Sequence, residues 1–157
     1  MSIGEGFEVR DAQPRDAPRL TSLVRDSGAY TGEYRAMIVR QTVDEAYIAA
    51  NPTRVCVDGA TIVGFAGLLV PGRGEAGEAE LDFMFVADDQ QRRGIGRILV
   101  DDVVAFARTA GIRRIHIVSH PPSEPFYRAV GAVPVGEIPP SGRVTWARPL
   151  LHLDIEP

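Results

Sequence analysis

Residues 79–119 constrain the fold more than any other part of this sequence. Residues 79–86 and 114–119 are rich in strand-forming side chains, and a stripe of apolar residues at helical spacing lies between them, over 94–110. Gly111 follows the stripe, at a position where glycine commonly ends a helix. Two strands joined by a helix form a crossover connection within one sheet. The segment therefore predicts an α/β protein.

The remaining periodic segments surround this crossover. Asp58-Gly59, between two strand-like runs, is a strong hairpin signal. The order β-α-α-β-β-β-α-β-α-β-β predicts a mixed sheet of about six to seven strands flanked by about four helices. The sequence shows no linker and no repeat, so residues 1–157 are expected to form a single domain. The further strands are expected at 7–10, 54–58, 61–70, 133–138 and 145–155, and the further helices at 14–28, 42–51 and 123–130.

The composition excludes several classes of protein. With 45% hydrophobic and 24% charged residues among 157, the chain is globular, and a net charge of -4 argues against a general nucleic-acid binder. The absence of a signal-peptide pattern and of an apolar run of roughly 18 residues predicts a cytoplasmic protein without a membrane partner. The one cysteine, Cys56, is expected to be buried, and three scattered histidines predict no metal site.

Several arginines of this acidic chain cluster within residues 92–128. Their clustering in the sequence predicts a local patch that binds anions. The residues concerned are Arg92, Arg93, Arg97, Arg113, Arg114 and Arg128.

Residues 91–96 form a glycine-rich turn between the strand at 79–86 and the long helix. Gly94 and Gly96 allow backbone N–H groups to approach an anion, and the start of a helix adds unsatisfied donors and a partial positive charge. Arginine side chains supply further positive charge. The turn is therefore predicted to hold the phosphates of a nucleotide-type cofactor.

Two common nucleotide motifs do not fit this turn. A P-loop requires Gly-Lys-Ser/Thr, whereas the chain has Gly96-Arg97-Ile98. A dinucleotide fingerprint requires glycine or alanine at position 99 and an acidic residue near the end of the next strand. The chain has Leu99, and its next strand ends in Ser119-His120.

Residues 85–99 instead resemble the acetyl-CoA turn of the GNAT superfamily of N-acetyltransferases, with its pattern Gln/Arg-x-x-Gly-x-Gly/Ala after a strand. The run 91–96 looks like that of ribosomal-protein N-terminal acetyltransferases. Residues 125–132 are similar to a second family motif, Phe-Tyr-x-x-x-Gly-Phe, and the order of elements matches the family fold. The chain departs from the family pattern at Asp88 (often Pro), Arg92 (often Gly), His120 (often Asn) and Ala132 (usually Phe).

The resemblance implies acetyl-CoA as the co-substrate, without a metal, and direct transfer of the acetyl group to a primary amine. Backbone groups of residues 84–86 would bind pantetheine, and an N–H there would polarise the thioester carbonyl. The implied cofactor-binding residues are Met84, Phe85, Val86, Gln91, Arg92, Arg93, Gly94, Ile95, Gly96, Arg97, His120, Ser123 and Phe126.

The resemblance also places Tyr127 as the acid that protonates the CoA thiolate; the alternative is a tyrosine that only packs. Strand alternation puts Glu80, Asp82 and Met84 on one face and Leu81, Phe83 and Phe85 on the other. Either Glu80 or Asp82 is a candidate base, with His120 and water as alternatives. Charged residues also alternate on strands that are simply half-exposed.

The stretch between the first two helices forms one wall of the acceptor site in this family. Tyr30, Glu33 and Tyr34 lie in it, and aromatic and acidic residues suit a cationic amine. The same stretch also reads as a solvated loop. The expected partner is a small-molecule or peptide amine, and a homodimer is possible. The alternative function is a catalytically silent module that binds acyl-CoA and acts as a sensor or regulator.

Overall fold

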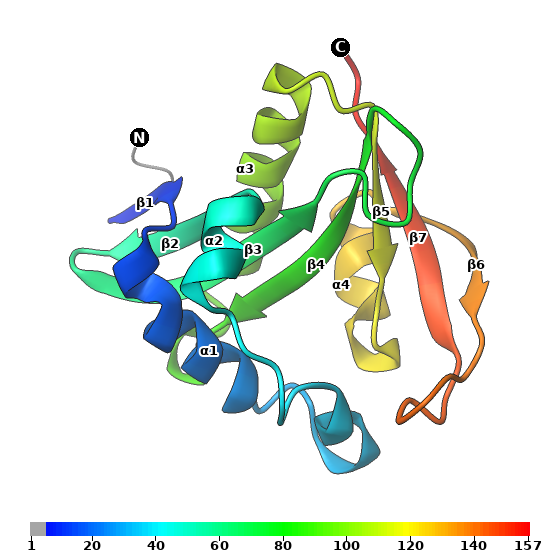
Figure 1. The fold of residues 1–157 in the computed structure, drawn as a ribbon, viewed down its shortest axis with the longest axis horizontal. Helices are drawn as coiled ribbons and strands as arrows, with labels where there is room; N and C mark the ends of the chain where they lie inside the picture. The colour runs from blue at the N-terminus through cyan, green and yellow to red at the C-terminus, as the bar shows by residue number, and fades with distance from the viewer. Residues whose placement is uncertain (1–5) are drawn as a thin grey trace.

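A single mixed sheet organises the part of the chain, residues 6–157, that the computed structural model describes (Figure 1). The strand order is β1-β2-β3-β4-β5-β7-β6, and only β4 and β5 are parallel. The predicted mixed α/β sheet is confirmed. The strands are β1 (Phe7–Asp11), β2 (Thr53–Asp58), β3 (Thr61–Leu69), β4 (Glu78–Val86), β5 (Arg114–Val118), β6 (Val133–Ile138) and β7 (Arg148–Asp154).

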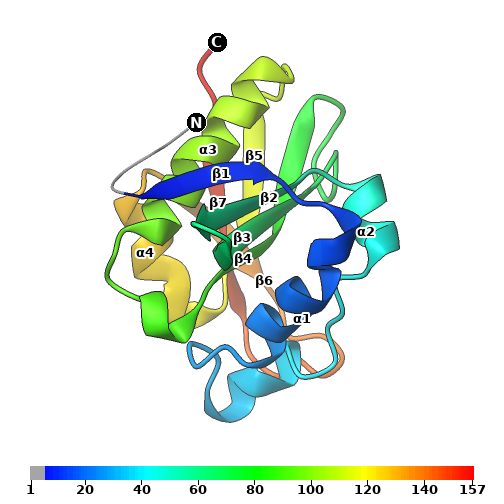
Figure 2. The ribbon, with the colours of Figure 1, turned by 90° about the vertical axis from the view of Figure 1, so that its left-hand side faces the viewer.

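Helices cover both faces of the sheet. They are α1 (Ala17–Arg25), α2 (Glu45–Ala50), α3 (Ile95–Thr109) and α4 (Glu124–Ala129). Figure 2 shows α1 and α2 on one face and α3 and α4 on the other. Phe65 of β3 packs toward α1, and its neighbour Ala66 packs toward α3. Alternate strand residues thus fill two apolar clusters, as expected for a sheet that is buried on both sides.

The first two predicted helices are shorter than the sequence indicated. The segment 14–28 divides into a 3₁₀ turn over Pro14–Asp16 and the helix α1. The helix α2 begins at Glu45 rather than at residue 42, because the Asp44 carboxylate accepts a hydrogen bond from Tyr47 N at 2.8 Å and caps it. Between them, residues Gly32–Met37 form another 3₁₀ turn.

A β-bulge in β4 overturns the predicted alternation of its side chains. Gly67 of β3 pairs with Phe83, but its neighbour Leu68 pairs with Leu81, so Asp82 is the extra residue. Leu81 packs with Met84 on the α3 face, whereas Phe83 packs on the α1 face. A strict period of two cannot survive an inserted residue.

The strands β4 and β5 part beyond this bulge. Their parallel register runs from Glu78 opposite Arg114 to Leu81 opposite Ile117, and β4 then continues to Val86 without β5 beside it. Figure 1 shows the two strands side by side where they begin and diverging toward their carboxyl ends, with α4 beside the opening. The fold therefore exposes backbone groups of residues 84–86 at a gap in the middle of the sheet.

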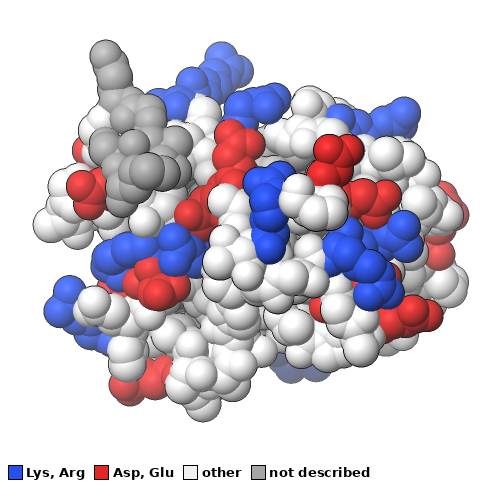
Figure 3. All heavy atoms as spheres, turned by 90° about the horizontal axis from the view of Figure 1, so that it is seen from above, with Lys and Arg blue, Asp and Glu red and all other residues white. Residues whose placement is uncertain are grey.

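The predicted arginine patch is wrong in its extent. Arg113 and Arg114 lie where β5 begins, at the end of the strand opposite the gap. They pair there with acidic residues: Arg113 Nη2 lies 3.0 Å from Glu78 Oε2, and Arg114 Nε lies 2.7 Å from Asp154 Oδ1. Figure 3 looks onto this end of the molecule and shows charges of both signs interspersed. Arg97 and Arg113 are separated because the 15-residue helix α3 lies between them and carries the chain from the gap to the opposite end of the sheet.

Glu78 is the buried centre of this charged cluster. Its carboxylate lies 2.8 Å from His116 Nε2 and accepts a hydrogen bond from the backbone N–H of Glu75. The hydrogen bond with His116, the backbone N–H and the Arg113 charge lower the pKa of Glu78 to about 2.

Because the pKa of Glu78 is lower in the folded protein than in the unfolded chain, its stabilising effect should be complete above about pH 4.5. That effect should be lost as pH falls toward 2. Urea unfolding between pH 6 and pH 2.5 should show a steeper loss of stability in the wild type than in Glu78→Gln. Parallel pH profiles would contradict this assignment. Asp154→Asn is the control: the pKa of Asp154 is also lowered by an arginine, but that carboxylate is exposed. Its substitution should therefore change the pH profile of stability less than Glu78→Gln does.

Candidate active site

A cavity of about 460 Å³ lies at the gap between β4 and β5. Its lining reaches from the edge of β4 to the start of α3 and to α4. Eleven of the thirteen predicted cofactor-binding residues line it: Met84, Phe85, Val86, Gln91, Arg92, Gly94, Ile95, Gly96, Arg97, Ser123 and Phe126.

The turn requires glycine at positions 94 and 96 for different physical reasons. Gly94 precedes α3 with φ 79°, in the left-handed region, and a Cβ there would meet no atom within 4 Å. Gly96 leaves room for Phe126, because a Cβ would stand 3.0 Å from that ring. Gln91 donates hydrogen bonds to the carbonyls of Val86 at 3.1 Å and Ala87 at 3.3 Å, which closes the turn. The first N–H groups of α3 therefore face the cavity from a fixed backbone.

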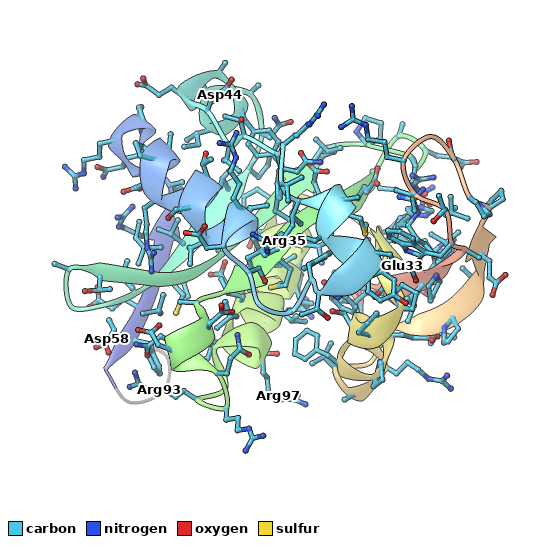
Figure 4. The ribbon with its side chains drawn as sticks, turned by 90° about the horizontal axis from the view of Figure 1, so that it is seen from below. Glu33, Arg35, Asp44, Asp58, Arg93 and Arg97 are labelled. Carbon is cyan, nitrogen blue, oxygen red and sulfur yellow. The ribbon has the colours of Figure 1, made fainter. Side chains whose placement is uncertain are left out.

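The three arginines of the turn point in different directions. Arg92 and Arg97 line the cavity, and Arg97 Nη2 also donates to the Ala129 carbonyl at 3.4 Å. Arg93 lies outside the cavity lining: its guanidinium is over the Phe7 ring and 3.4 Å from Asp58 Oδ2. Figure 4 shows Arg93 beside Asp58 and apart from Arg97. Arg92 has φ 67°, so it adopts the conformation that the family's glycine would take without strain.

Two tyrosines border the cavity. Tyr127, on α4, is 8% exposed, and burial together with the nearby Tyr30 phenol raises its pKa above the ordinary value. Burial raises the pKa of Tyr30 to about 12. Within residues 6–157, neither phenol has a hydrogen-bond partner in the protein. Both hydroxyls therefore keep their protons at neutral pH and are free to donate them.

His120 lies behind Tyr30 rather than in the cavity lining. The two rings stack with centroids 3.8 Å apart, and His120 Nε2 donates to the Ala29 carbonyl at 3.3 Å. Burial lowers the pKa of His120, and the hydrogen bond to Ala29 opposes this shift only in part. Among the described residues, His120 Nδ1 has no hydrogen-bond partner. The structure thus places this histidine as a support for Tyr30.

A second cavity, of about 320 Å³, opens on the α1 face of the sheet. Tyr30 and Phe85 line both cavities, so the two spaces adjoin at these side chains. Glu80 and Asp82 lie in the second cavity with Phe83, on the face opposite Met84. The bulge at Asp82 is what brings both carboxylates to this side.

The two carboxylates have different surroundings. Glu80 is paired with Arg73, with its Oε2 3.2 Å from Nε and its Oε1 3.0 Å from the Arg73 backbone N. Asp82 accepts a hydrogen bond of 2.8 Å from Tyr47 Oη. Its partial burial raises the pKa of Asp82, the Tyr47 hydrogen bond lowers it, and the Glu80 charge raises it; the net shift is upward. Asp82 is thus the carboxylate better suited to accept a proton.

Of the three predicted acceptor-site residues, Tyr30 alone lines either of these two cavities. Glu33 is exposed on the 3₁₀ turn that Figure 4 labels. Tyr34 packs edge-on against Trp146, with ring centroids 4.8 Å apart. The aromatic and acidic composition of the stretch did not reveal which side chains face inward.

Several cavity residues were not predicted. Tyr47 reaches Asp82 over Gly67, where a Cβ would stand 2.6 Å from its hydroxyl. Asp88, which replaces a frequent proline and lies outside both cavity linings, accepts a hydrogen bond from Gly28 N–H that is shared between its two carboxylate oxygens, each 3.0 Å from the nitrogen. This hydrogen bond ties the Tyr30 segment to the turn. The glycine at position 67 was the one sequence signal of a close approach. The unpredicted lining residues include Ser27, Ala29, Gln90 and Pro122 in the first cavity and Met37, Tyr47, Arg73 and Arg148 in the second.

The fold and the site define an α/β protein with two adjoining cavities, one of them at the start of a helix. The family model of the acetyltransferase (GNAT) family matches residues 18–132, more than half of the chain. The chain therefore belongs to the GNAT acetyltransferase family. No curated protein sequence gives a significant match.

Solved structures share the fold at low sequence identity. A GCN5-related N-acetyltransferase from Rhodopseudomonas palustris is 19% identical with a TM-score of 0.77, over 99% of each chain. YncA from Salmonella typhimurium, solved with its cofactor acetyl-CoA, is 18% identical with a TM-score of 0.75, over 97% of this chain and 95% of that one. The ribosomal-protein-S18-alanine N-acetyltransferase from Escherichia coli is 15% identical with a TM-score of 0.70, over 95% and 94%. These likenesses show the fold.

None of the helices within residues 6–157 combines the length and the apolar character required to cross a lipid bilayer.

Proposed function

We propose that this protein is an N-acetyltransferase that moves the acetyl group of acetyl-CoA directly to a primary amine. The observation that carries the proposal is the contact of two cavities at Tyr30 and Phe85. One cavity has an anion-binding helix start, and the other has carboxylates suited to a cationic amine. A cofactor in the first and an amine in the second would meet at the gap between β4 and β5.

The residues of the first cavity fit acetyl-CoA. The left-handed Gly94 aims the first N–H groups of α3 into the cavity, and Arg92 and Arg97 add positive charge for a pyrophosphate. Beyond Leu81 the β4 edge has no β5 partner, so backbone groups of residues 84–86 are available to an extended amide such as pantetheine. YncA, a member of the same fold, was solved with this cofactor.

Acetyl-CoA, when bound, would supply an acetyl group activated as a thioester. Asp82 would remove a proton from the ammonium of the acceptor, directly or through a water molecule, because its raised pKa brings it closer to neutral pH. Tyr127 Oη would hold the proton required by the departing thiolate, since burial keeps that phenol protonated. Phe85 and Tyr30 would orient the two reactants at the junction.

Cys56 supports direct transfer over an acyl-enzyme. It is fully buried in the cluster beneath α3, and it lines neither of these cavities. Burial, together with the charges of Asp102 and Asp58, raises the pKa of the Cys56 thiol to about 11. A thiol of that kind has little thiolate at neutral pH and is a poor nucleophile.

Two measurements test the proposal. Thermal unfolding with acetyl-CoA and, separately, with ATP should show stabilisation by acetyl-CoA alone. Thiol release should then be followed with a broad panel of amines. Stabilisation by acetyl-CoA without thiol release from any amine would replace the enzyme with an acyl-CoA-binding regulatory module. Stabilisation by ATP alone would reject both functions.

Gly94→Glu is expected to weaken acetyl-CoA binding by on the order of 100-fold or more, because it places a carboxylate beside the pyrophosphate site. Any side chain at φ 79° also costs roughly 1–2 kcal/mol of stability. Gly94→Ala carries the same backbone strain without the charge and is the matched control. Isothermal titration of both variants separates the two effects. Equal affinities in Gly94→Glu and Gly94→Ala would remove the turn from the cofactor site.

A further inference from the structure

The second cavity contains four charged side chains, two of each sign: Arg73, Glu80, Asp82 and Arg148. Arg73 and Glu80 neutralise each other through the ion pair described above. Asp82 has a hydrogen bond from neutral Tyr47, and within residues 6–157 it has no cationic partner. Arg148 likewise has no carboxylate or hydrogen-bond partner in the described part of the chain. The cavity therefore presents one unmatched anion and one unmatched cation.

Arg148 is the first residue of β7. The Pro149 carbonyl accepts a hydrogen bond of 3.0 Å from Ser119 N, which fixes this end of β7 to the end of β5. Arg148 Nε is a fully buried nitrogen without a partner. A guanidinium stays charged at all ordinary pH values, and an unsatisfied buried donor destabilises the folded protein. An arginine kept in this state at a cavity wall is suited to donate hydrogen bonds to a ligand oxygen, and the geometry of its donors matches a carboxylate.

The unmatched charges also exclude other acceptors. If one ammonium of a polyamine were held at Asp82, its second ammonium would meet Arg148, which is also positive. A volume of about 320 Å³, walled by apolar side chains such as Met37, Ile38 and Phe83, suits a small molecule rather than a folded protein surface.

We propose that the acceptor is a small amino acid-type molecule, whose amine is held at Asp82 and whose carboxylate is held at Arg148. This inference rests on the proposed acetyltransferase function and names the chemical class of its acceptor. Arg148 is accordingly a specificity-determining residue, because it contacts the part of the acceptor that does not react.

The test compares free amino acids with their carboxamides, such as leucine with leucinamide and phenylalanine with phenylalaninamide, together with 1,4-diaminobutane. Thiol release should favour the amino acids over their amides by about 10- to 100-fold in kcat/KM, as expected for a hydrogen-bonded charge. In Arg148→Gln the preference should fall to near unity, mainly through a higher KM for the amino acids. Arg148→Lys keeps the positive charge but lacks the paired N–H donors of the guanidinium, so it should retain an intermediate preference. This variant also tests the proposal if Arg148→Gln does not fold.

Arg143→Gln is the matched control, since Arg143 is exposed on the connection between β6 and β7. Arg143→Gln should keep the full preference for amino acids over their amides. Acetyl-CoA should stabilise every variant equally against heat. Equal or better turnover of amides, diamines or peptide N-termini by the wild type would overturn the amino acid assignment while leaving the acetyltransferase intact. An unchanged preference in Arg148→Gln would overturn the role of Arg148. Lack of turnover with every amine would instead remove the enzymatic function itself.

Discussion

Tyr127→Phe is expected to lower turnover by about 10²- to 10⁴-fold while leaving the affinity for acetyl-CoA nearly unchanged. The substitution removes only the phenolic proton donor. The aromatic ring, which packs in the cluster with α3, remains in place. No described residue bonds to this hydroxyl, so the thermal stability of the variant should stay close to that of the wild type. Steady-state kinetics, acetyl-CoA titration and thermal unfolding measure the three quantities.

Tyr30→Phe is the comparison that gives this experiment its meaning. Tyr30 is the other buried phenol on the same cavity, and burial also raises its pKa, to about 12. If Tyr127 is the acid, Tyr30→Phe should lose far less turnover, because its ring can still stack on Phe85 and His120. The reverse ranking would assign the proton to Tyr30. Wild-type turnover in both variants would mean that neither phenol protonates the thiolate.

Asp82→Asn should produce the second large effect, a loss of about 100-fold or more in turnover at neutral pH. The amide keeps the shape of the side chain and a hydrogen bond to Tyr47, but it cannot accept the ammonium proton. Glu80→Gln is the isosteric control in the same cavity, and its loss should be smaller because Glu80 is already engaged by Arg73. A larger loss in Glu80→Gln than in Asp82→Asn would transfer the base role to Glu80.

The pH dependence gives an independent test of Asp82. A base acts when it is deprotonated, so activity should rise with pH through the pKa of Asp82, and this limb should lie above the usual range of aspartate. The Tyr47 hydrogen bond lowers that pKa, so Tyr47→Phe should move the limb to higher pH, whereas a merely structural role for Tyr47 would leave it unmoved. The limb should disappear in Asp82→Asn. A limb that persists there belongs to another group.

The bulge at Asp82 explains why the sequence could identify these two carboxylates but could not place them. Alternation predicted Glu80 and Asp82 beside Met84, on the face that carries the first cavity. The inserted residue moves the register by one, so both acids lie instead in the second cavity, on the opposite face. An isolated sequence carries no mark of such a bulge, because the bulge is fixed by pairing with β3, which is distant in the chain.

Arg92 and Arg113 are a second case in which the sequence identified residues but could not place them. Both belong to the arginines that cluster within residues 92–128 of the sequence. The structure places Arg92 on the cavity and Arg113 against Glu78 at the other end of β5. The helix α3 lies between the two residues and places them at opposite ends of the sheet, so their proximity in sequence does not produce a surface patch.

By itself, the sequence determined the mixed sheet, the crossover and the turn at residues 91–96, because these depend on local periodicity and on glycine. Gly94 permits the left-handed conformation that the turn requires, and this is visible in the sequence itself. The amphipathic stripe likewise predicts the helix α3 from local sequence alone. Only the tertiary structure decided that Arg93 turns away from the cavity, that His120 lies behind Tyr30, and that Arg148 stands unpaired in a cavity with Asp82. Those outcomes depend on contacts between segments up to 91 residues apart, as for His120 and Ala29, and such contacts are set by packing rather than by neighbouring residues.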